Sequence, residues 1–330
     1  MDPQRRCLQT GAAAVALAIL LRLIAGGAVG GLLKVLTSPA AVSTFFFLET
    51  GRILDPNPTP LAEVFPAATI PTEDPSPVAL DAVAVFGEAD AHLVQVNSAC
   101  GYDTPVSGWL ETALSWNLKS DQPTVLILHS HGTESYTKTE SYEESSAYRT
   151  KDTGYNVVSI GDRLVQALEK QGIQAVHDRT MHDSPSYNDS YNNARASMEE
   201  YLSKYPSIRL VLDIHRDAVA DGGSQMAFTA ENGALAQLML VVGTDAGGLT
   251  HPQWEQNMSL AVKLHAQLQK DHPGICRPIS FRSQRFNQDL STGALIVEVG
   301  GTGNTRQQAL AAAEALAEAI GKLSLGANLQ

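Results

Sequence analysis

The stretch that decides the fold is TVLILHSHGTESY, residues 124–136. Its first five residues form a short apolar run of branched side chains, which is typical of a strand buried on both faces. The run then ends in two histidines and a glutamate, His129, His131 and Glu134. Either the chain simply leaves the core here, or a cation binds at the end of the strand.

Strand-like and helix-like patterns alternate from about residue 121 to residue 325. Apolar runs predict strands at 124–129, 173–177, 208–214, 238–242 and 294–299, with one more near Ala227. Apolar residues at helical spacing predict helices at 156–170, 187–202, 252–268 and 305–323. This alternation predicts an α/β fold, with a mostly parallel or mixed sheet between two layers of helices.

Three of the predicted strands end in side chains that can carry chemistry. The first ends in HSHGTE, and the strand IRLVLDI ends in His215, Arg216 and Asp217. The strand ALIV delivers Glu298 and then turns at a pair of glycines. Because ligands bind beyond the carboxyl ends of parallel strands, we expect these three ends to meet at one edge of the sheet.

The residue types at these ends predict a catalytic zinc site. Such a site takes three protein ligands and leaves one position for water, and His131, Glu134 and His215 supply such a set. Glu298 is then available as a general base toward that water. Asp213, close to His215 in the sequence, is interpreted as a group that orients its ring, as is Asp217.

Structural interpretations compete with these roles. A single His-x-x-Glu pattern is common on surface turns, and His215 alone could be an ordinary strand end. His129 continues the strand pattern and is interpreted as a core histidine or as an indirect donor to the site. Asp152 and Asp162 are interpreted as solvated charges near a helix. Five other histidines lack a partner at motif spacing and are interpreted as structural or surface residues: His177, His182, His251, His265 and His272.

Composition limits the function. The chain has 330 residues, 44% of them hydrophobic, and a net charge of −12. This charge argues against general nucleic-acid binding, which needs clustered Lys and Arg. The three cysteines, Cys7, Cys100 and Cys276, show no CxxC spacing, and a bridge between Cys100 and Cys276 is left open.

The N-terminal segment predicts a membrane anchor. Residues 11–36 form an apolar stretch long enough to span a bilayer, interrupted by Arg22. A cleaved signal peptide is the alternative, but its apolar core is normally shorter. We therefore expect an uncleaved, single-pass anchor, with Arg5 and Arg6 in the cytoplasm and the rest of the protein outside the cell membrane.

The sequence predicts four segments. Residues 1–36 are the cytoplasmic tip and transmembrane anchor, and 37–80 are an extracytoplasmic linker whose proline-rich composition does not favour folding. Residues 81–120 are an accessory segment of uncertain structure, and 121–330 are the catalytic domain.

Several segments together resemble the stage II sporulation protein P family. They are LILHSHGTESY, YNVVSIGDRLVQALEKQGI, SYNDSYNNARAS, YPSIRLVLDIHRDAV and ALIVEVGGTGNT. The resemblance implies a membrane-anchored peptidoglycan hydrolase whose catalytic domain has the fold of zinc-dependent N-acetylmuramoyl-L-alanine amidases. It also implies cleavage of the amide between the lactyl group and L-alanine, an additional endopeptidase activity, and a place in spore engulfment beside stage II sporulation proteins D and M.

The resemblance also implies roles for single residues. His131 and His215 match the histidines of the family's metal site, and Glu298 matches the catalytic glutamate of the related amidases. In those amidases a carboxylate near the position of Asp152 is the third ligand, whereas Glu134 follows the geometry of zinc carboxypeptidases. We predict Glu134, with Asp152 as the alternative.

Two arginines, Arg195 and Arg216, are predicted to hold a substrate carboxylate through their forked guanidinium groups. Two other functions stay open at this point. One is a zinc carboxypeptidase that acts on stem peptides with the same residues, and the other is a non-catalytic wall-binding protein that activates a partner.

Overall fold

The computed structural model describes residues 83–218, 226–230 and 233–329. The strands are β1 (Val96–Ser98), β2 (Val125–Leu128), β3 (Ala175–His177), β4 (Leu210–Asp217), β5 (Leu238–Val242), β6 (Ile279–Phe281) and β7 (Ala294–Gly301). The helices are α4 (Val106–Glu111), α5 (Val157–Lys170), α6 (Ser190–Lys204), α7 (Trp254–Asp271) and α8 (Arg306–Lys322), with 3₁₀ turns η1 (Glu88–Leu93) and η2 (Gln288–Leu290). The predicted α/β class is confirmed.

The strands of the described part of the chain form one seven-stranded mixed sheet, in the order β1-β6-β5-β7-β4-β2-β3. β3, β2, β4 and β7 are parallel to one another, and β5 is antiparallel to β7. β6 and β1 continue in the direction of β5. The carboxyl ends of β2, β4 and β7 therefore lie at the same edge, as the predicted parallel strands required.

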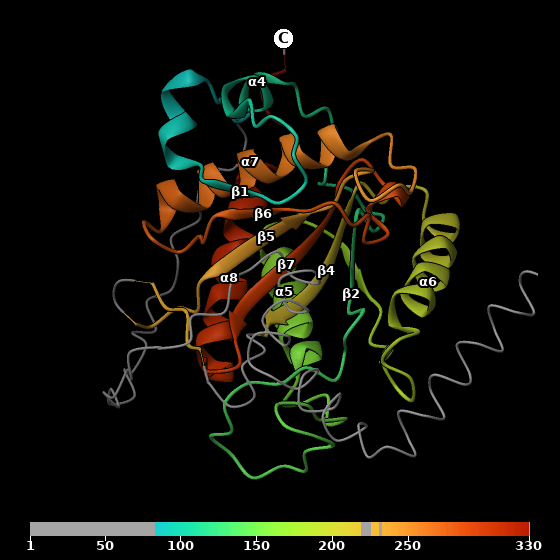
Figure 1. Ribbon diagram of the computed structural model, residues 1–330. Coiled ribbons are helices and arrows are strands. Elements are labelled where there is room, and N and C mark those ends of the chain that lie inside the picture. The colour runs from blue at the N-terminus through green and yellow to red at the C-terminus, as the bar shows by residue number, and fades with distance from the viewer. Residues whose placement is uncertain (1–82, 219–225, 231–232, 330) are drawn as a thin grey trace, which may run out of the picture. The chain divides into compact units, whose positions relative to one another are not determined.

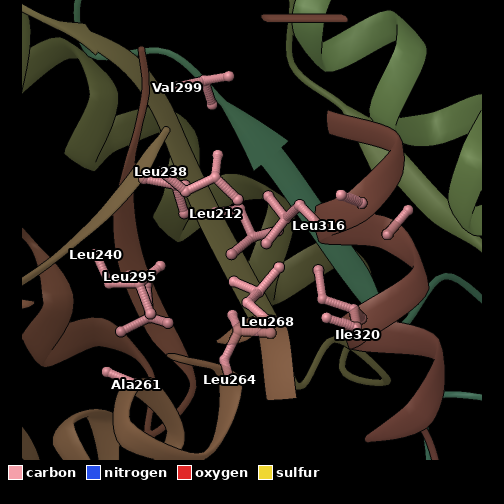
Figure 2. Close-up of a cluster of buried hydrophobic side chains, with 14 of the residues drawn as sticks. Leu212, Leu238, Leu240, Ala261, Leu264, Leu268, Leu295, Val299, Leu316 and Ile320 are labelled. Atoms are coloured by element: carbon pink, nitrogen blue, oxygen red, sulfur yellow. The ribbon is translucent and has the colours of Figure 1, made fainter. Parts of the chain in front are cut away.

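Helices cover both faces of this sheet. In Figure 1, α6 lies on one side of the sheet and α5 and α8 on the other. The larger core joins α5, α7 and α8 to alternate residues of the strands, including Leu212 of β4 and Leu295 of β7. Figure 2 shows Leu212 beside Leu316 of α8 and Leu295 beside Leu240 of β5. A smaller core joins α6 to the opposite face.

Local signals set where two of the helices next to the site begin. The side chain of Asn156 accepts a hydrogen bond from the backbone N–H of Val158, which caps α5. Thr305 and Gln308 form a reciprocal capping box at the start of α8. α5 and α8 are the next helices along the chain after β2 and β7.

Residues 83–118 supply η1, β1 and α4 and add an edge strand to the sheet. Cys100 and Cys276 are free thiols, so the bridge between them is not formed. None of the helices in the described ranges is both long and apolar enough to cross a membrane. The predicted anchor and proline-rich linker, residues 11–36 and 37–80, lie outside these ranges. Near Ala227 the described residues contain no strand, only an isolated bridge between Thr229 and Ala236.

Candidate active site

The edge at which β2, β4 and β7 end gathers five polar side chains, which we call the site cluster: His131, Glu134, Asp213, His215 and Glu298. β2 pairs with β4 up to Leu128 and Asp213, and then turns away. A turn follows, closed by the hydrogen bond from the N–H of Glu134 to the carbonyl of His131 (3.1 Å). This turn carries both His131 and Glu134 over the end of β4.

His215 and Glu298 are neighbours across the sheet. They are partners in the parallel register of β4 and β7, immediately before a bulge that lies between His215 and Asp217. Both side chains follow the alternation that places Val211 and Ala294 against α6, so both point to the α6 face. Gly300, two residues after Glu298, has φ +70, which favours glycine, and this turns the chain away behind the carboxylate.

Glu134 lies against His215 and is held by two arginines. Its Oε2 is 3.6 Å from Nδ1 of His215 and accepts a hydrogen bond from the backbone N–H of Arg216 (3.1 Å). Its Oε1 is 3.4 Å from the guanidinium groups of both Arg149 and Arg216. With a side chain only 6% exposed, Glu134 has a fixed position beside His215.

His131 lies between two tyrosines. Its ring stacks on Tyr187 (4.4 Å between centroids, 7° between planes) and meets Tyr191 edge-on at 5.5 Å. Its ring centroid is 5.4 Å from that of His215. Asp183 lies near the same ring, with its Oδ2 4.0 Å from Nδ1 of His131, and this carboxylate also pairs with Arg149 at 2.8 Å.

The electrostatics of the site cluster favour a positive charge at its centre. Burial lowers the pKa of His215, but the carboxylates of Asp213, Glu134 and Glu298 outweigh burial and raise it to about 10. Burial lowers the pKa of His131 to about 4, so this ring is neutral at pH 7. In the metal-free protein, His215 is therefore protonated. The same carboxylates that favour this proton would also favour a bound cation.

Asp213 is the closest anion to His215. Burial raises the pKa of its carboxyl, but the charge of His215 and the hydrogen bonds from Ser130 lower it to about 2. Its Oδ1 lies 2.8 Å from Nε2 of His215, although the N–H is not aligned for a hydrogen bond. The contact is therefore an ion pair, and it leaves Nδ1 of His215 facing Glu134.

The donor set of the site cluster fits zinc by its chemistry. Two imidazoles and a carboxylate are the usual ligands of a catalytic zinc, and Nδ1 of His131 is buried without a hydrogen-bond partner among the described residues. No group of three or more His, Cys, Asp or Glu within the described ranges has its donor atoms in a metal-binding arrangement. The cluster therefore brings the donors together without holding them in coordination geometry.

A second pair of histidines lies on the opposite face of β2. His129 continues the alternation of Val125 and Ile127 toward α5, and its Nε2 lies 2.8 Å from Nε2 of His177. Its Nδ1 lies 2.9 Å from the carbonyl oxygen of Ile214. We call His129 and His177 the bridging pair, and His131 and His215 the site pair.

Three residues predicted to bind metal or substrate make contacts with other groups of the protein. Asp152 is exposed, and its carboxylate accepts a hydrogen bond from the N–H of Gly154, so the structure brings Glu134 and not Asp152 to the two histidines. Arg216 is 3% exposed, and its guanidinium bonds Glu134 and the carbonyls of Ser135 and Tyr148. Thus Arg216 holds Glu134 in place.

Arg195 lies on α6 and forms a two-pronged ion pair with Asp289, so its guanidinium is committed to the protein. The residues that sequence reasoning missed are Arg149, Asp183, Tyr187 and Tyr191. The first two lie in loops without periodicity, which offer no signal. The tyrosines lie in the quoted segment SYNDSYNNARAS, where they received no role.

A shallow cavity of about 270 Å³ lies outside the site cluster, against α5 and α8. Its wall includes Asp162, Arg163, Arg179 and Arg306. Each of these arginines pairs with a carboxylate, so the cavity does not add a free positive charge to the site.

Comparisons with solved structures find amidases of low similarity. One is the N-acetylmuramoyl-L-alanine amidase AmiC2 of Nostoc punctiforme, which is 17% identical, with 61% of this chain and 95% of that chain covered and a TM-score of 0.36. Another is the CwlD amidase from Clostridioides difficile in complex with the GerS lipoprotein, at 14% identity, 60% and 94% coverage and a TM-score of 0.37. Similarity this low does not inform the site.

Sequence relatives are more informative. Stage II sporulation protein P of Bacillus subtilis (strain 168) is 28% identical over 214 residues, which are 62% of this chain and 51% of the relative. The chain thus spans about half the length of this curated relative. The profile of the family described as stage II sporulation protein P matches residues 73–321, a range that contains the whole site cluster and all seven strands. The chain therefore belongs to the stage II sporulation protein P family.

Proposed function

We propose that this protein is a zinc-dependent peptidoglycan hydrolase that cleaves the amide between the lactyl group of N-acetylmuramic acid and the L-alanine of the stem peptide. One observation carries the proposal. In a chain of this family, His131, Glu134, His215 and Glu298 converge from three separate segments on one edge of the sheet. This set contains the donors for one metal ion and a carboxylate for proton transfer.

His131, Glu134 and His215 would hold the ion, which would supply a Lewis acid that polarises the scissile carbonyl. Asp213 sets the ring of His215 so that Nδ1 faces Glu134. Arg216 and Arg149 keep Glu134 ionised, because their positive charges help to outweigh the effect of burial on the pKa of its carboxyl.

Glu298 is the proton carrier in this proposal. It accepts a proton from the attacking water as the new C–O bond forms, and it donates that proton to the departing nitrogen as the C–N bond breaks. The products are a free lactyl carboxylate and a stem peptide with a free L-alanine amino group. The position of Glu298 next to His215 in the sheet register supports this role.

Product analysis on purified sacculi tests the proposal with the full-length protein. New N-terminal L-alanine on the stem peptides is the expected result. Release of terminal D-amino acids would instead identify a carboxypeptidase, and newly exposed cross-link amines an endopeptidase. Binding to sacculi without any cleavage in zinc-replete buffer would identify a wall-binding protein and would overturn the enzyme proposal.

We also propose the cellular setting that the sequence predicts. Residues 11–36 anchor the protein in the cell membrane, with its catalytic domain outside. Stage II sporulation proteins D and M are the proposed partners in spore engulfment. Fractionation of membranes, followed by protease treatment of intact cells without the wall, tests the topology, and co-purification from detergent extracts tests the partners.

A further inference from the structure

The bridging pair connects α5 to the strand that carries His215. Starting at β4, the carbonyl of Ile214 can only accept a hydrogen bond, so Nδ1 of His129 carries the hydrogen of that 2.9 Å contact. In a neutral ring, Nε2 of His129 is then an acceptor, and His177 donates to it from its own Nε2 at 2.8 Å. The connection therefore has a defined direction.

Its outer end is Asp162 on α5. Nδ1 of His177 lies 3.1 Å from Oδ1 of Asp162. His177 donates at both ends when its ring carries two protons, and Arg179 also pairs with Asp162. Exposure rises along the connection, from 0% for His129 to 8% for the side chain of His177 and 35% for that of Asp162.

The backbone geometry explains why Ile214 needs this contact. β2 and β4 are paired only as far as Leu128 and Asp213. The N–H of Ser130, two residues beyond the end of β2, donates instead to the side chain of Asp213 at 2.8 Å. The pairing of β4 with β2 thus ends before Ile214, one residue before His215, and on this side the side chain of His129 replaces the missing strand donor.

The bridging pair packs closely against α5 at Gly161. A Cβ at Gly161 of α5 would lie 2.5 Å from Nε2 of His177 and 2.8 Å from Nε2 of His129. A glycine inside a helix is destabilising relative to alanine. Only the absence of a side chain at this position lets the two rings meet and keeps their contact with α5.

We propose that His177, acting through His129, is a positioning residue for His215. By fixing the carbonyl of Ile214, the bridging pair fixes the direction in which β4 presents His215 to Glu134. The part of the inference that concerns zinc rests on the proposed function. The part that concerns the backbone of β4 does not depend on it.

The test compares full-length wild type with His177→Leu, His177→Gln and His265→Leu. His265 is a matched control, because it is a 1% exposed histidine on α7 that belongs to neither pair. Zinc affinity is measured by competition with a chromophoric chelator, and kcat and KM are measured on solubilised peptidoglycan. Hydrogen exchange of a peptide covering 213–217 is measured in the metal-free protein.

We expect His177→Leu to lower zinc affinity and kcat by about 10-fold, the lower end of the effect of removing a direct partner of a metal-ligating histidine, because His177 acts only through His129. KM should change less than about twofold, since His177 does not touch substrate. Exchange at 213–217 should accelerate. His177→Gln, which keeps a donor near the Nε2 position, should restore most of the loss, and His265→Leu should alter none of these quantities.

The outcomes separate the two proposals. If wild type neither binds zinc nor cleaves peptidoglycan, the proposed function fails, and the exchange data alone decide the positioning role. If His177→Leu matches wild type in exchange and zinc affinity, or if glutamine rescues nothing, the positioning role is overturned. Should His177→Leu not fold, Asp162→Asn replaces it, with a smaller change in the same direction expected and no change overturning the inference.

Discussion

Two pairs of histidines lie on the two faces of one sheet edge, and their surroundings differ. In the bridging pair, Nε2 of His129 and Nε2 of His177 lie 2.8 Å apart. Their other ring nitrogens contact the carbonyl of Ile214 and the carboxylate of Asp162. In the site pair, the ring centroids of His131 and His215 are 5.4 Å apart, and the carboxylates of Glu134 and Asp213 lie beside the ring of His215. One pair closes a connection within the protein, and the other leaves a nitrogen of His131 without a hydrogen-bond partner in the described ranges.

The difference shows why burial and residue type do not identify a site histidine by themselves. His129 and His215 are both buried and both lie at the end of a core strand. Burial dominates for His129 and lowers its pKa to about 3, whereas three carboxylates raise that of His215 to about 10. The charges of neighbouring groups, and not the depth of burial, distinguish a histidine suited to bind a cation from one that only forms hydrogen bonds within the protein.

The largest expected effect separates the two pairs by metal binding. His131→Ala or His215→Ala should abolish stoichiometric zinc and sacculus digestion, because two remaining ligands are too few for tight binding. His129→Ala should weaken zinc binding but keep it measurable. Elemental analysis of purified protein after dialysis checks this. Stoichiometric zinc in both site-pair variants would show that the site is misassigned.

The next largest effect concerns Glu298, the proposed general base beside the site pair. Glu298→Gln should preserve the fold and the zinc while turnover falls at least about a hundredfold, the usual scale for a lost general base. If Glu298 were instead the third ligand, this variant would lose zinc and Glu134→Gln would retain it. Measuring zinc and released L-alanine amino groups on both variants decides the arrangement, and near-normal turnover by Glu298→Gln would refute the proposed mechanism.

Much of the fold could be predicted because its buried strands are continuous apolar runs. The run at 238–242 predicts β5 with the bounds that the structure has. Whether β5 runs parallel or antiparallel to its neighbours was not predictable, because an apolar run carries no signal for strand direction. β5 is antiparallel to β7, and the described residues between β4 and β5 contain no crossover helix of the kind that parallel neighbours need. β1 and β6, at three residues each, are too short to show a period.

The part of the site that lies on strands was predictable from the sequence. His215 and Glu298 belong to apolar strands whose ends the α/β pattern brings together, and the structure places them in register. Arg149 and Asp183, which surround Glu134 and His131, come from irregular loops, where no spacing rule predicts contact. The contact of His129 with His177 was missed for a similar reason, because no spacing rule predicts which side chains of the neighbouring strands β2 and β3 meet.

A smaller effect tests the packing of the bridging pair. Gly161→Ala should lower the free energy of unfolding by about 1–3 kcal/mol, the usual range for overpacking a core, because the added Cβ meets both rings. Gly108→Ala is the matched control, since Gly108 also lies within a helix but a Cβ there has nothing within 4 Å. The control should be neutral or stabilising. Equal urea midpoints for the two variants would contradict the packing described here.

The smallest expected effect is a difference in how the two pairs respond to pH in metal-free protein. The folded pKa of His215, about 10, lies above its unfolded value of about 6.5. The stability it contributes is therefore complete below pH 6.5 and is lost as the pH rises toward 10. The folded pKa of His129, about 3, lies below the unfolded value, so its contribution is complete above pH 6.5 and is lost as the pH falls.

Each ring can change the free energy of unfolding by at most about 1.4 kcal/mol per pH unit. Urea unfolding in excess chelator, at pH 7 and 8 and again at pH 6 and 5, measures both limbs. His215→Asn should flatten the alkaline limb while leaving the acidic limb in place. His129→Asn should reduce the acidic slope by up to one proton, because the other buried histidines also contribute there, and should spare the alkaline limb. A wild-type curve that stays flat from pH 7 to 8 would mean that the carboxylates do not hold a proton on His215, and the electrostatic contrast between the pairs would then be wrong.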